Sequence, residues 1–233
     1  MKIYAARVCE IPNRLYEHIF HLINGQRREK VTALKHEKEW LRSIWAGLLL
    51  RYAFLAEGYG EELWQRVEIV EGSYGKPYLS GYENFFYSLS HSGEWVICAV
   101  DDVETGADIQ EIGMLKMAVA KRFYAKEEYD RLLGHEDDSE KQTDDLYKMW
   151  AAKESCVKLT GRGIGAGISR YVTDSAYTHI KDIEENSLFF IRLYEEIPNY
   201  IICVCSRRER FPERILIPDL VNNVFNMGGE GTC

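Results

Sequence analysis

The stretch WAAKESCVK, residues 150–158, decides the fold, because it forms the centre of a helical pattern that strand patterns flank on both sides. The pattern predicts a helix from about residue 144 to 160, which the glycine-rich stretch Gly161–Gly167 ends. At about 100° per residue, one face within about 140° holds Trp150, Lys153, Glu154, Val157 and Lys158. On their own, Glu154 and Lys158 would be an ordinary surface ion pair, whereas the tryptophan beside them favours partial burial and a functional role.

Outside this stretch, helical and strand patterns occur together in each half of the chain. The first half combines a strand at residues 1–9 and a helix at 35–57 with strands at 67–71, 85–90, 95–100 and 107–110. The second half combines helices at about 114–124, 126–133 and 144–160 with strands at 188–194 and 200–205. The polar stretch Gly134–Asp145 predicts an exposed loop, and residues from Phe211 onward show no strong period and end in a frayed tail. This order of elements predicts an α+β fold.

The composition bounds the class of protein. With 233 residues, the chain lies between one and two domains on the usual scale of about 150 residues each. Its 46% hydrophobic and 28% charged residues exclude a disordered or collagen-like chain. The net charge of −8 argues against non-specific nucleic-acid binding, which depends on Lys and Arg at phosphates. Basic residues nevertheless outnumber acidic ones between Gln26 and Arg51, which indicates either a solvated helix face or an anion site.

The cysteines and the N-terminus indicate the cellular compartment in which the protein is expected. Cys9, Cys98, Cys156, Cys203, Cys205 and Cys233 are scattered, with no CxxC pair and no histidine at metal-ligand spacing, which predicts reduced thiols. The N-terminus MKIYAARV lacks the apolar core of a signal peptide, and no window approaches the roughly 20 apolar residues of a membrane span. We therefore expect a cytoplasmic protein without a membrane segment.

Two short motifs place polar side chains at strand positions. In SLSHSG, residues 88–93, hydroxyl groups and an imidazole precede a glycine turn, where several donors can bind a phosphate. Taken alone, His91 would be interpreted as a structural or exposed histidine. In GADIQE, residues 106–111, Asp108 and Gln110 share one strand face and offer oxygen ligands to Mg²⁺. Taken alone, the motif would be interpreted as an edge strand with a solvated face.

Two familiar catalytic patterns are missing from the sequence. Gly161–Gly167 lacks the Gly-Lys-Ser/Thr ending of a phosphate-binding P-loop and follows a helix instead of opening one. No GxSxG pattern occurs, and no serine or cysteine stands in a recognisable arrangement with a histidine and an aspartate.

Taken in order, six pieces of the sequence resemble the 4′-phosphopantetheinyl transferases of the Sfp-like branch. They are RREKVTALKHEKEWLRS (27–43), YGKP (74–77), SLSHSGEW (88–95), GADIQ (106–110), KRFYAKEEY (121–129) and WAAKESCVK (150–158). One such piece would be weak, but six in the right order over most of the chain argue against coincidence.

The resemblance implies a fold, a reaction and partners. The fold is α+β with two similar lobes in a pseudo-twofold arrangement and the active site in the cleft between them. Residues 1–104 would form the lobe that contacts the phosphates and adenine of coenzyme A, and 105–233 the lobe with the metal site, the catalytic helix and the carrier-protein docking surface. The reaction of such a holo-[carrier protein] synthase moves the 4′-phosphopantetheine of coenzyme A to a serine of an apo acyl or peptidyl carrier protein and releases 3′,5′-ADP. Mg²⁺ is the implied cofactor, and a monomer without nucleic-acid partners is expected.

The resemblance also assigns roles to residues. Arg27, Lys30, Arg42, Ser43 and His91 would hold phosphates of coenzyme A, Ser90 and Lys158 would lie near the pyrophosphate, and Gly75, Lys76 and Pro77 would line the adenine side. Asp108 and Glu154 would bind Mg²⁺ together with the pyrophosphate. Glu154, directly or through a metal-bound water, would take the proton of the carrier serine, and Lys153 or Lys158 would stabilise the leaving phosphate.

One position departs from the family pattern Gly-Ile-Asp-Ile-Glu, whose final glutamate is a third metal ligand. Gln110 stands there, and because an amide oxygen or a water molecule can fill the position, we expect an active enzyme with a raised Mg²⁺ requirement. Two other interpretations remain open: a weakly active module that binds coenzyme A or carrier proteins, and a Mg²⁺-dependent phosphohydrolase. The carrier is expected to dock near the loop after Lys158, where exposed Ile164 and Ile168 would receive a carrier helix or simply anchor the loop.

Overall fold

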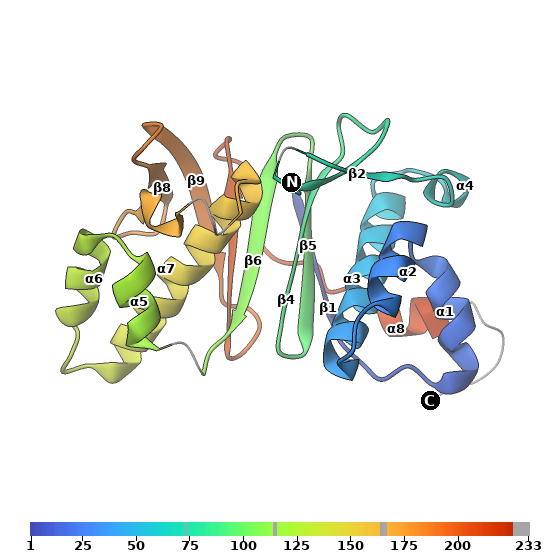
Figure 1. Ribbon diagram of the computed structural model, residues 1–233, viewed down its shortest axis with the longest axis horizontal. Coiled ribbons are helices and arrows are strands. Elements are labelled where there is room, and N and C mark those ends of the chain that lie inside the picture. Colours follow the sequence, from blue (N-terminus) through green and yellow to red (C-terminus); the bar gives the residue numbers. More distant parts are fainter. Residues whose placement is uncertain (73, 114–115, 164–166, 226–233) are drawn as a thin grey trace.

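Two β-sheets lie side by side in the middle of the molecule, with helices at both outer sides (Figure 1). The computed structural model describes residues 1–72, 74–113, 116–163 and 167–225. One sheet has the strand order β1-β5-β4 and the other the order β6-β10-β9-β8-β7. Every strand pair within these sheets is antiparallel. Helices and strands in this mixture confirm the α+β class, whereas the division into lobes at residue 104 stays a prediction.

The smaller sheet is covered by the long helix α3 (Glu37–Ala56). Its strands are β1 (Lys2–Arg7), β4 (Phe86–Ser92) and β5 (Trp95–Asp101). Apolar side chains of α3 and of these strands share one buried cluster, which explains why α3 is apolar over most of its length. The remaining elements on this side are a 3₁₀ turn (Asn13–Leu15), α1 (Tyr16–Leu22), α2 (Gly25–Thr32), α4 (Glu61–Trp64), the hairpin of β2 (Ile69–Glu71) and β3 (Pro77–Leu79), and α8 (Leu220–Phe225).

The larger sheet is covered by the long helix α7 (Ser139–Thr160). Its strands are β6 (Thr105–Glu111), β7 (Tyr171–Thr173), β8 (His179–Asp182), β9 (Ser187–Tyr194) and β10 (Tyr200–Ser206), and α5 (Met117–Phe123), α6 (Lys126–Leu133) and a 3₁₀ turn (Ile168–Arg170) complete this side. At Gly106, a Cβ would lie 1.9 Å from the carbonyl oxygen of Ser155. Only glycine therefore allows α7 to lie this close to β6.

Three serine hydroxyls join the two sheets where β4 lies beside β6. The backbone N–H groups of Ala107, Ile109 and Glu111 donate to the Oγ atoms of Ser88, Ser90 and Ser92 at 2.9, 3.4 and 2.9 Å. Alternate residues of a strand point to the same side, so SLSHS presents one hydroxyl to every second N–H of β6. We call this set of contacts the serine seam. It holds Asp108, in the middle of β6, directly beside β4.

One expectation from the sequence is wrong in detail. The stretch Gly134–Asp145 is not entirely a loop, because Asp138 accepts a hydrogen bond from Lys141 N and thereby starts α7 at Ser139. After β10, the chain contacts both sheets: Leu216 exchanges backbone hydrogen bonds with Ile3 and Ala5, and Phe211 and Ile215 pack in a cluster that residues of both sheets share. The expected frayed tail at 226–233 lies outside the described residues.

In the described ranges, Cys9, Cys98, Cys156, Cys203 and Cys205 are free thiols, in agreement with the sequence-based expectation. Among the helices of those ranges, none has the length and apolar character to cross a bilayer.

Candidate active site

A cavity of about 320 Å³ lies between the C-terminal end of α7 and three elements on the side of the smaller sheet, namely α2, α3 and β4. Its lining includes most of the residues that the sequence assigns to coenzyme A: Arg27, Lys30, Gly75, Lys76, Pro77, His91 and Lys158. The described lining also contains Tyr74, Tyr87 and Val157 but no Asp or Glu side chain. Arg27 and Lys30 of α2 thus bring positive charge to a described lining without acidic side chains, and Lys158 of α7 adds a cation that Asp108 neutralises, an arrangement that favours an anionic ligand.

Next to the cavity, Lys158 joins α7 to the serine seam. Its ammonium group donates to Ser90 Oγ at 2.7 Å and to Asp108 Oδ1 at 2.6 Å, and Ser90 Oγ in turn donates to the same Asp108 oxygen at 2.8 Å. Asp108 is almost completely buried. The sequence assigned these three residues to the pyrophosphate and the metal, and the structure brings them into direct contact.

Glu154 lies one helical turn before Lys158 and is only 9% exposed. Its carboxylate accepts no hydrogen bond from any described residue. Burial first, and then the charge of Asp108, raise the pKa of Glu154 to about 7, although Lys158 opposes the shift. Two neighbouring carboxylates, one of them without a partner, fit the donor set of a hard divalent cation.

Gln110 occupies the position of the expected third ligand and contacts the site through its nitrogen. Its Nε2 donates to Asp108 Oδ2 at 2.7 Å, so the amide holds the carboxylate in place. Within the described ranges, no three His, Cys, Asp or Glu side chains form a potential metal site. The protein residues therefore offer two carboxylates to a metal, and Gln110 can add an oxygen only when its amide turns over.

Lys153 is turned away from this site, and its expected place beside Lys158 is wrong. The side chain is 0% exposed, and its ammonium group pairs with Glu128 Oε2 at 2.6 Å and donates to the carbonyl oxygen of Tyr171. The helical face inferred from the sequence was too wide, because α6 and β7 pack against one part of it. Of the two lysines proposed for the leaving phosphate, Lys158 alone lines the cavity.

Lys76 lines the cavity with its stem, while its ammonium group is a structural contact. That group pairs with Glu104 and donates to the carbonyl oxygens of Thr105 at 3.3 Å and Leu159 at 2.8 Å. A cation at the C-terminal end of α7 is favourable, because the last carbonyl groups of a helix lack partners within the helix. Lys76 therefore connects the β2–β3 hairpin to the end of α7 and does not offer its charge to the cavity.

Arg42 and Ser43, which were expected to hold phosphates, belong to α3 and are not among the described residues that line the cavity. Arg42 Nε donates to the carbonyl oxygen of Gly93 at 2.9 Å, and Ser43 is buried in α3 with no partner for its hydroxyl among the described residues. Desolvation, and then the charges of Arg42 and Lys158, lower the pKa of His91. Tyr87 also lines the cavity and was not expected there, although strand alternation puts it on the same face of β4 as His91 and could have indicated it.

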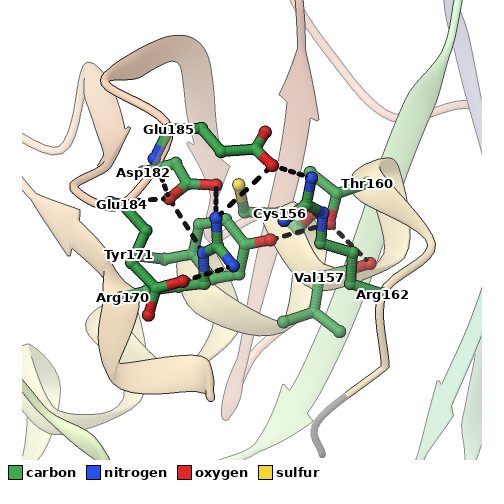
Figure 2. Close-up of polar contacts among 9 residues, drawn as sticks. All are labelled: Cys156, Val157, Thr160, Arg162, Arg170, Tyr171, Asp182, Glu184 and Glu185. Atoms are coloured by element: carbon green, nitrogen blue, oxygen red, sulfur yellow. Dashed lines mark hydrogen bonds and ion pairs between the residues drawn. The ribbon is translucent and has the colours of Figure 1, made fainter. Parts of the chain in front are cut away.

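The chain that follows α7 is tied to the turn between β8 and β9 (Figure 2). Arg170 forms two hydrogen bonds of 2.8 Å with Asp182 and an ion pair of 2.7 Å with Glu184, and Arg162 pairs with Glu185. Ile168 is 1% exposed and belongs to the core under α7, so its expected exposure to a carrier helix is wrong. Ile164 lies outside the described residues.

Comparisons with known proteins point to one family. A model of the 4′-phosphopantetheinyl transferase superfamily matches residues 102–205. The chain is 31% identical over 219 residues to 4′-phosphopantetheinyl transferase Sfp of Bacillus subtilis (strain 168), a match that covers 92% of this chain and 96% of that one. It is 28% identical to 4′-phosphopantetheinyl transferase psf-1 of Bacillus pumilus, with 93% and 94% covered.

A solved structure also matches part of the chain. The crystal structure of Thermotoga maritima holo-[acyl-carrier-protein] synthase aligns with a TM-score of 0.35 and 15% identity over 44% of this chain and 61% of that one. The identity and coverage of the sequence relatives decide the assignment: the chain belongs to the 4′-phosphopantetheinyl transferase superfamily, in its Sfp-like branch.

Proposed function

We propose that this protein transfers the 4′-phosphopantetheine group of coenzyme A to a serine hydroxyl of an apo acyl or peptidyl carrier protein and releases 3′,5′-ADP. One observation carries the proposal: a cavity whose described lining holds Arg27, Lys30 and Lys158 and no acidic side chain lies next to Asp108 and Glu154. The cations of the cavity suit a ligand with several phosphates. The carboxylates of Asp108 and Glu154 lie where the reacting pyrophosphate of such a ligand would be.

The chain's residues divide the binding of coenzyme A between them. Arg27, Lys30 and His91 would bind phosphate oxygens, with Arg42 and Ser43 beside them, and Gly75 and Pro77 would border the adenine. Lys158 would bind the pyrophosphate, with Ser90 holding its ammonium group in place. Asp108 and Glu154, with Gln110 beside them, would hold Mg²⁺, which when bound reduces the negative charge of the pyrophosphate that repels a nucleophile.

The transfer itself needs a proton acceptor and a cation at the leaving group. The serine oxygen of the carrier forms a bond to the β-phosphorus of coenzyme A, the P–O bond to the bridging oxygen breaks, and 3′,5′-ADP leaves as an anion. Glu154 would accept the serine proton, because a carboxyl with a pKa of about 7 is well matched to proton transfer near neutral pH. Lys158 would donate a hydrogen bond to the leaving phosphate.

The experiment is intact-mass measurement of purified apo carrier proteins after incubation with coenzyme A, Mg²⁺ and this protein. We expect a mass gain of one phosphopantetheine group on at least one carrier. Lys158→Ala and Glu154→Gln should each reduce the rate by about 10²- to 10⁴-fold. No gain on a panel of fatty-acid, polyketide and non-ribosomal peptide carriers would sink the proposal, and pantetheine phosphate released without a carrier would indicate a phosphohydrolase instead.

We also propose that one chain is sufficient for the activity. The cavity draws its lining from α2, β4 and α7 of the same chain, so no second copy is needed to complete it. Light scattering coupled to size-exclusion chromatography should give a monomer at concentrations where transfer is measured.

A further inference from the structure

The face of the larger sheet that points away from α7 is covered only in part. Over β10, Phe211 and Ile215 pack in a cluster with Val204, and the hydroxyl of Tyr194 donates to the carbonyl oxygen of Pro212 at 2.8 Å. Farther along the same face, β7, β8 and β9 present accessible side chains. We call these six the open face: Val172, His179, Lys181, Leu188, Phe190 and Arg192.

The open face is more apolar than a sheet face in contact with water usually is. Antiparallel sheets with one solvated face place polar residues there, in alternation with the residues of the core. Leu188 is nevertheless 56% exposed, and Val172 and Phe190 share its side of the sheet. Ile183, in the turn after β8, adds a further side chain that is 55% exposed. Exposed apolar residues grouped in this way mark an interaction surface.

A cavity of about 560 Å³ lies at this apolar group. Val172, Ile183 and Leu188 line it together with the start of α6 at Ala125 and Lys126. Such a depression can receive apolar side chains that protrude from a folded partner. A lipid surface, in contrast, is contacted by apolar side chains that themselves protrude.

The charge of the open face is positive, although the whole chain has a net charge of −8. Lys181 lies between Val172 and Leu188 in the register of the three strands, and Arg192 is exposed on β9. None of the six side chains of the open face is acidic. Because complementary charges decide which partners bind, this surface favours an acidic partner.

The carboxylates near the open face do not neutralise these cations. Asp174, in the cavity lining, accepts hydrogen bonds from the backbone N–H groups of Thr178 and His179 at 2.8 and 2.9 Å. No described carboxylate forms an ion pair with Lys181 or Arg192. Two cations therefore remain available to a partner.

The shape of the sheet decides between a strand and a helix as the partner segment. At the edge strand β7, the carbonyl oxygen of Tyr171 already accepts from Lys153, and the N–H group of Thr173 donates to Glu128 Oε1 at 2.9 Å. An added strand would find these edge groups occupied. The open face measures about 10 Å from β7 to β9, close to the diameter of a helix with its side chains.

The open face and the proposed reaction centre lie on opposite sides of the sheet. Asp108 pairs with Cys203 in the ladder of β6 and β10, and Cys203 belongs to the cluster under α7. Lys158, on α7, contacts Asp108 from that side. A partner on the open face would therefore leave the reaction centre accessible.

We propose that the open face binds an acidic amphipathic helix of a partner protein. Apolar side chains of this helix enter the cavity at Leu188, and its carboxylates pair with Lys181 and Arg192. The contact does not depend on the proposed transfer reaction, and it gives the chain a second surface for protein recognition.

Titration of the full-length protein with two synthetic peptides tests the inference by methyl NMR. Both peptides have about 18 residues, enough to form a helix, with leucines on one face; the other positions hold glutamate in one and lysine in the other. The glutamate peptide should shift the signals of Val172, Ile183 and Leu188 with a dissociation constant below about 100 µM that rises with salt. The exposed methyl groups of Leu63 and Val70, on α4 and β2, should not shift.

Two results of this titration would overturn the inference. One is that the three signals do not shift at about 1 mM glutamate peptide. The other is that the lysine peptide shifts them equally, since the charge of the open face would then have no part in binding.

Single variants with matched controls separate the charged from the apolar contact. Lys181→Glu should weaken binding of the glutamate peptide about tenfold, and Lys141→Glu, at an exposed lysine in the first turn of α7, should not change it. Leu188→Gln should weaken binding about fivefold, because part of the transfer free energy of the leucine is lost, and Leu63→Gln should not. All four replaced side chains are exposed, so the melting temperatures should stay close to that of the wild type. Equal effects of a variant and its control would contradict the proposed contact.

Other occupants of the open face would give different results. Vesicles of phosphatidylglycerol that bind in place of the glutamate peptide, and that Lys181→Glu releases, would make the face a membrane contact. Self-association of the wild type that Leu188→Gln abolishes would make the occupant a second copy of the chain. Slower modification of an isolated apo carrier protein by Leu188→Gln would make the occupant the carrier itself. Each of these outcomes overturns the inference, while failure of the transferase proposal leaves it intact, because peptide binding is measured without coenzyme A.

Discussion

The ammonium group of Lys76 donates a hydrogen bond of 2.8 Å to the carbonyl oxygen of Leu159, which joins the β2–β3 hairpin to the last turn of α7. These two residues come from opposite halves of the chain, and the contact sets the relative position of the two sides of the cavity. Glu104, between the two sheets, neutralises the same ammonium group.

Lys76→Met should therefore destabilise the whole protein. The substitution removes the cation that contacts the carbonyl group of Leu159 at the helix end and the partly buried carboxylate of Glu104. The free energy of unfolding should therefore fall by roughly 2–4 kcal/mol. Denaturant unfolding measures the change. Lys126→Met is the matched control, since it removes an exposed lysine paired with Asp130 and should leave unfolding unchanged. Equal effects of the two variants would contradict the structural role of Lys76.

Ser88→Ala should show that the serine seam holds the sheets together. Its hydroxyl is the acceptor of the buried Ala107 N–H, which would lose its partner and destabilise the protein by about 1–3 kcal/mol. Ser92→Ala, at the exposed end of the seam, should cost less because water can replace the hydroxyl. Thermal or denaturant unfolding of the two variants gives the order, and a larger effect at Ser92 would argue against the seam.

Gln110→Glu should increase the affinity for Mg²⁺, by about tenfold, because it adds a third carboxylate beside Asp108 and Glu154. Without metal, the new charge repels Asp108 and replaces the hydrogen bond from Gln110 Nε2, so the melting temperature should fall and then recover on addition of Mg²⁺. Calorimetric titration with Mg²⁺ measures the affinity. A midpoint that does not move to lower concentration would count against Gln110 as a ligand position; Glu111→Gln, whose side chain contacts Tyr200, is the control.

Glu154→Gln should make stability less dependent on pH. Folding raises the pKa of Glu154 from 4.5 to about 7, so the folded state binds its proton more tightly than the unfolded state does. The stability of the wild-type protein should therefore fall as pH rises between these two values. Without metal, the variant should be more stable than wild type by roughly 1–3 kcal/mol at pH 8 and equally stable at pH 4.

Denaturant unfolding at pH 4, 6 and 8 provides this comparison. Glu140→Gln, an exposed position in the first turn of α7, is the control and should gain no stability over wild type between pH 6 and pH 8. A difference between wild type and Glu154→Gln that does not change with pH would show that burial does not hold the proton on Glu154.

Much of the site could be predicted because its chemistry depends on local spacing. Glu154 and Lys158 are one helical turn apart, and Asp108 and Gln110 share a strand face, so each pair follows from periodicity, whereas the meeting of the two pairs was implied by the family resemblance. The polar stretch at 134–145 was harder, because a single cap at Asp138 decides where α7 begins. The contact of the chain after β10 with the smaller sheet depends on long-range pairs such as Leu216 with Ile3, which leave no periodic pattern.

The residues whose roles were misjudged are those with partners far away in the sequence. Lys153 lies on the predicted face of α7, but Glu128, on another helix, takes its charge. Lys76 belongs to a motif that resembles a ligand contact, while its charge is bound by Glu104 and by the end of α7. In both cases a lysine near the site is neutralised by a carboxylate that only the folded chain brings close.

The middle position of the serine seam has a consequence for how the enzyme could be monitored. Ser90 Oγ uses its full bonding capacity, since it accepts from Ile109 N and Lys158 and donates to Asp108. A main-chain hydrogen bond between two strands involves no side-chain proton, whereas the Ser90 hydroxyl donates a hydrogen bond to the charged cluster of Asp108 and Lys158. A small displacement of one half of the chain relative to the other would therefore change the hydrogen bonds of Asp108 before the protein unfolds. The catalytic rate would accordingly report on the alignment of the two halves.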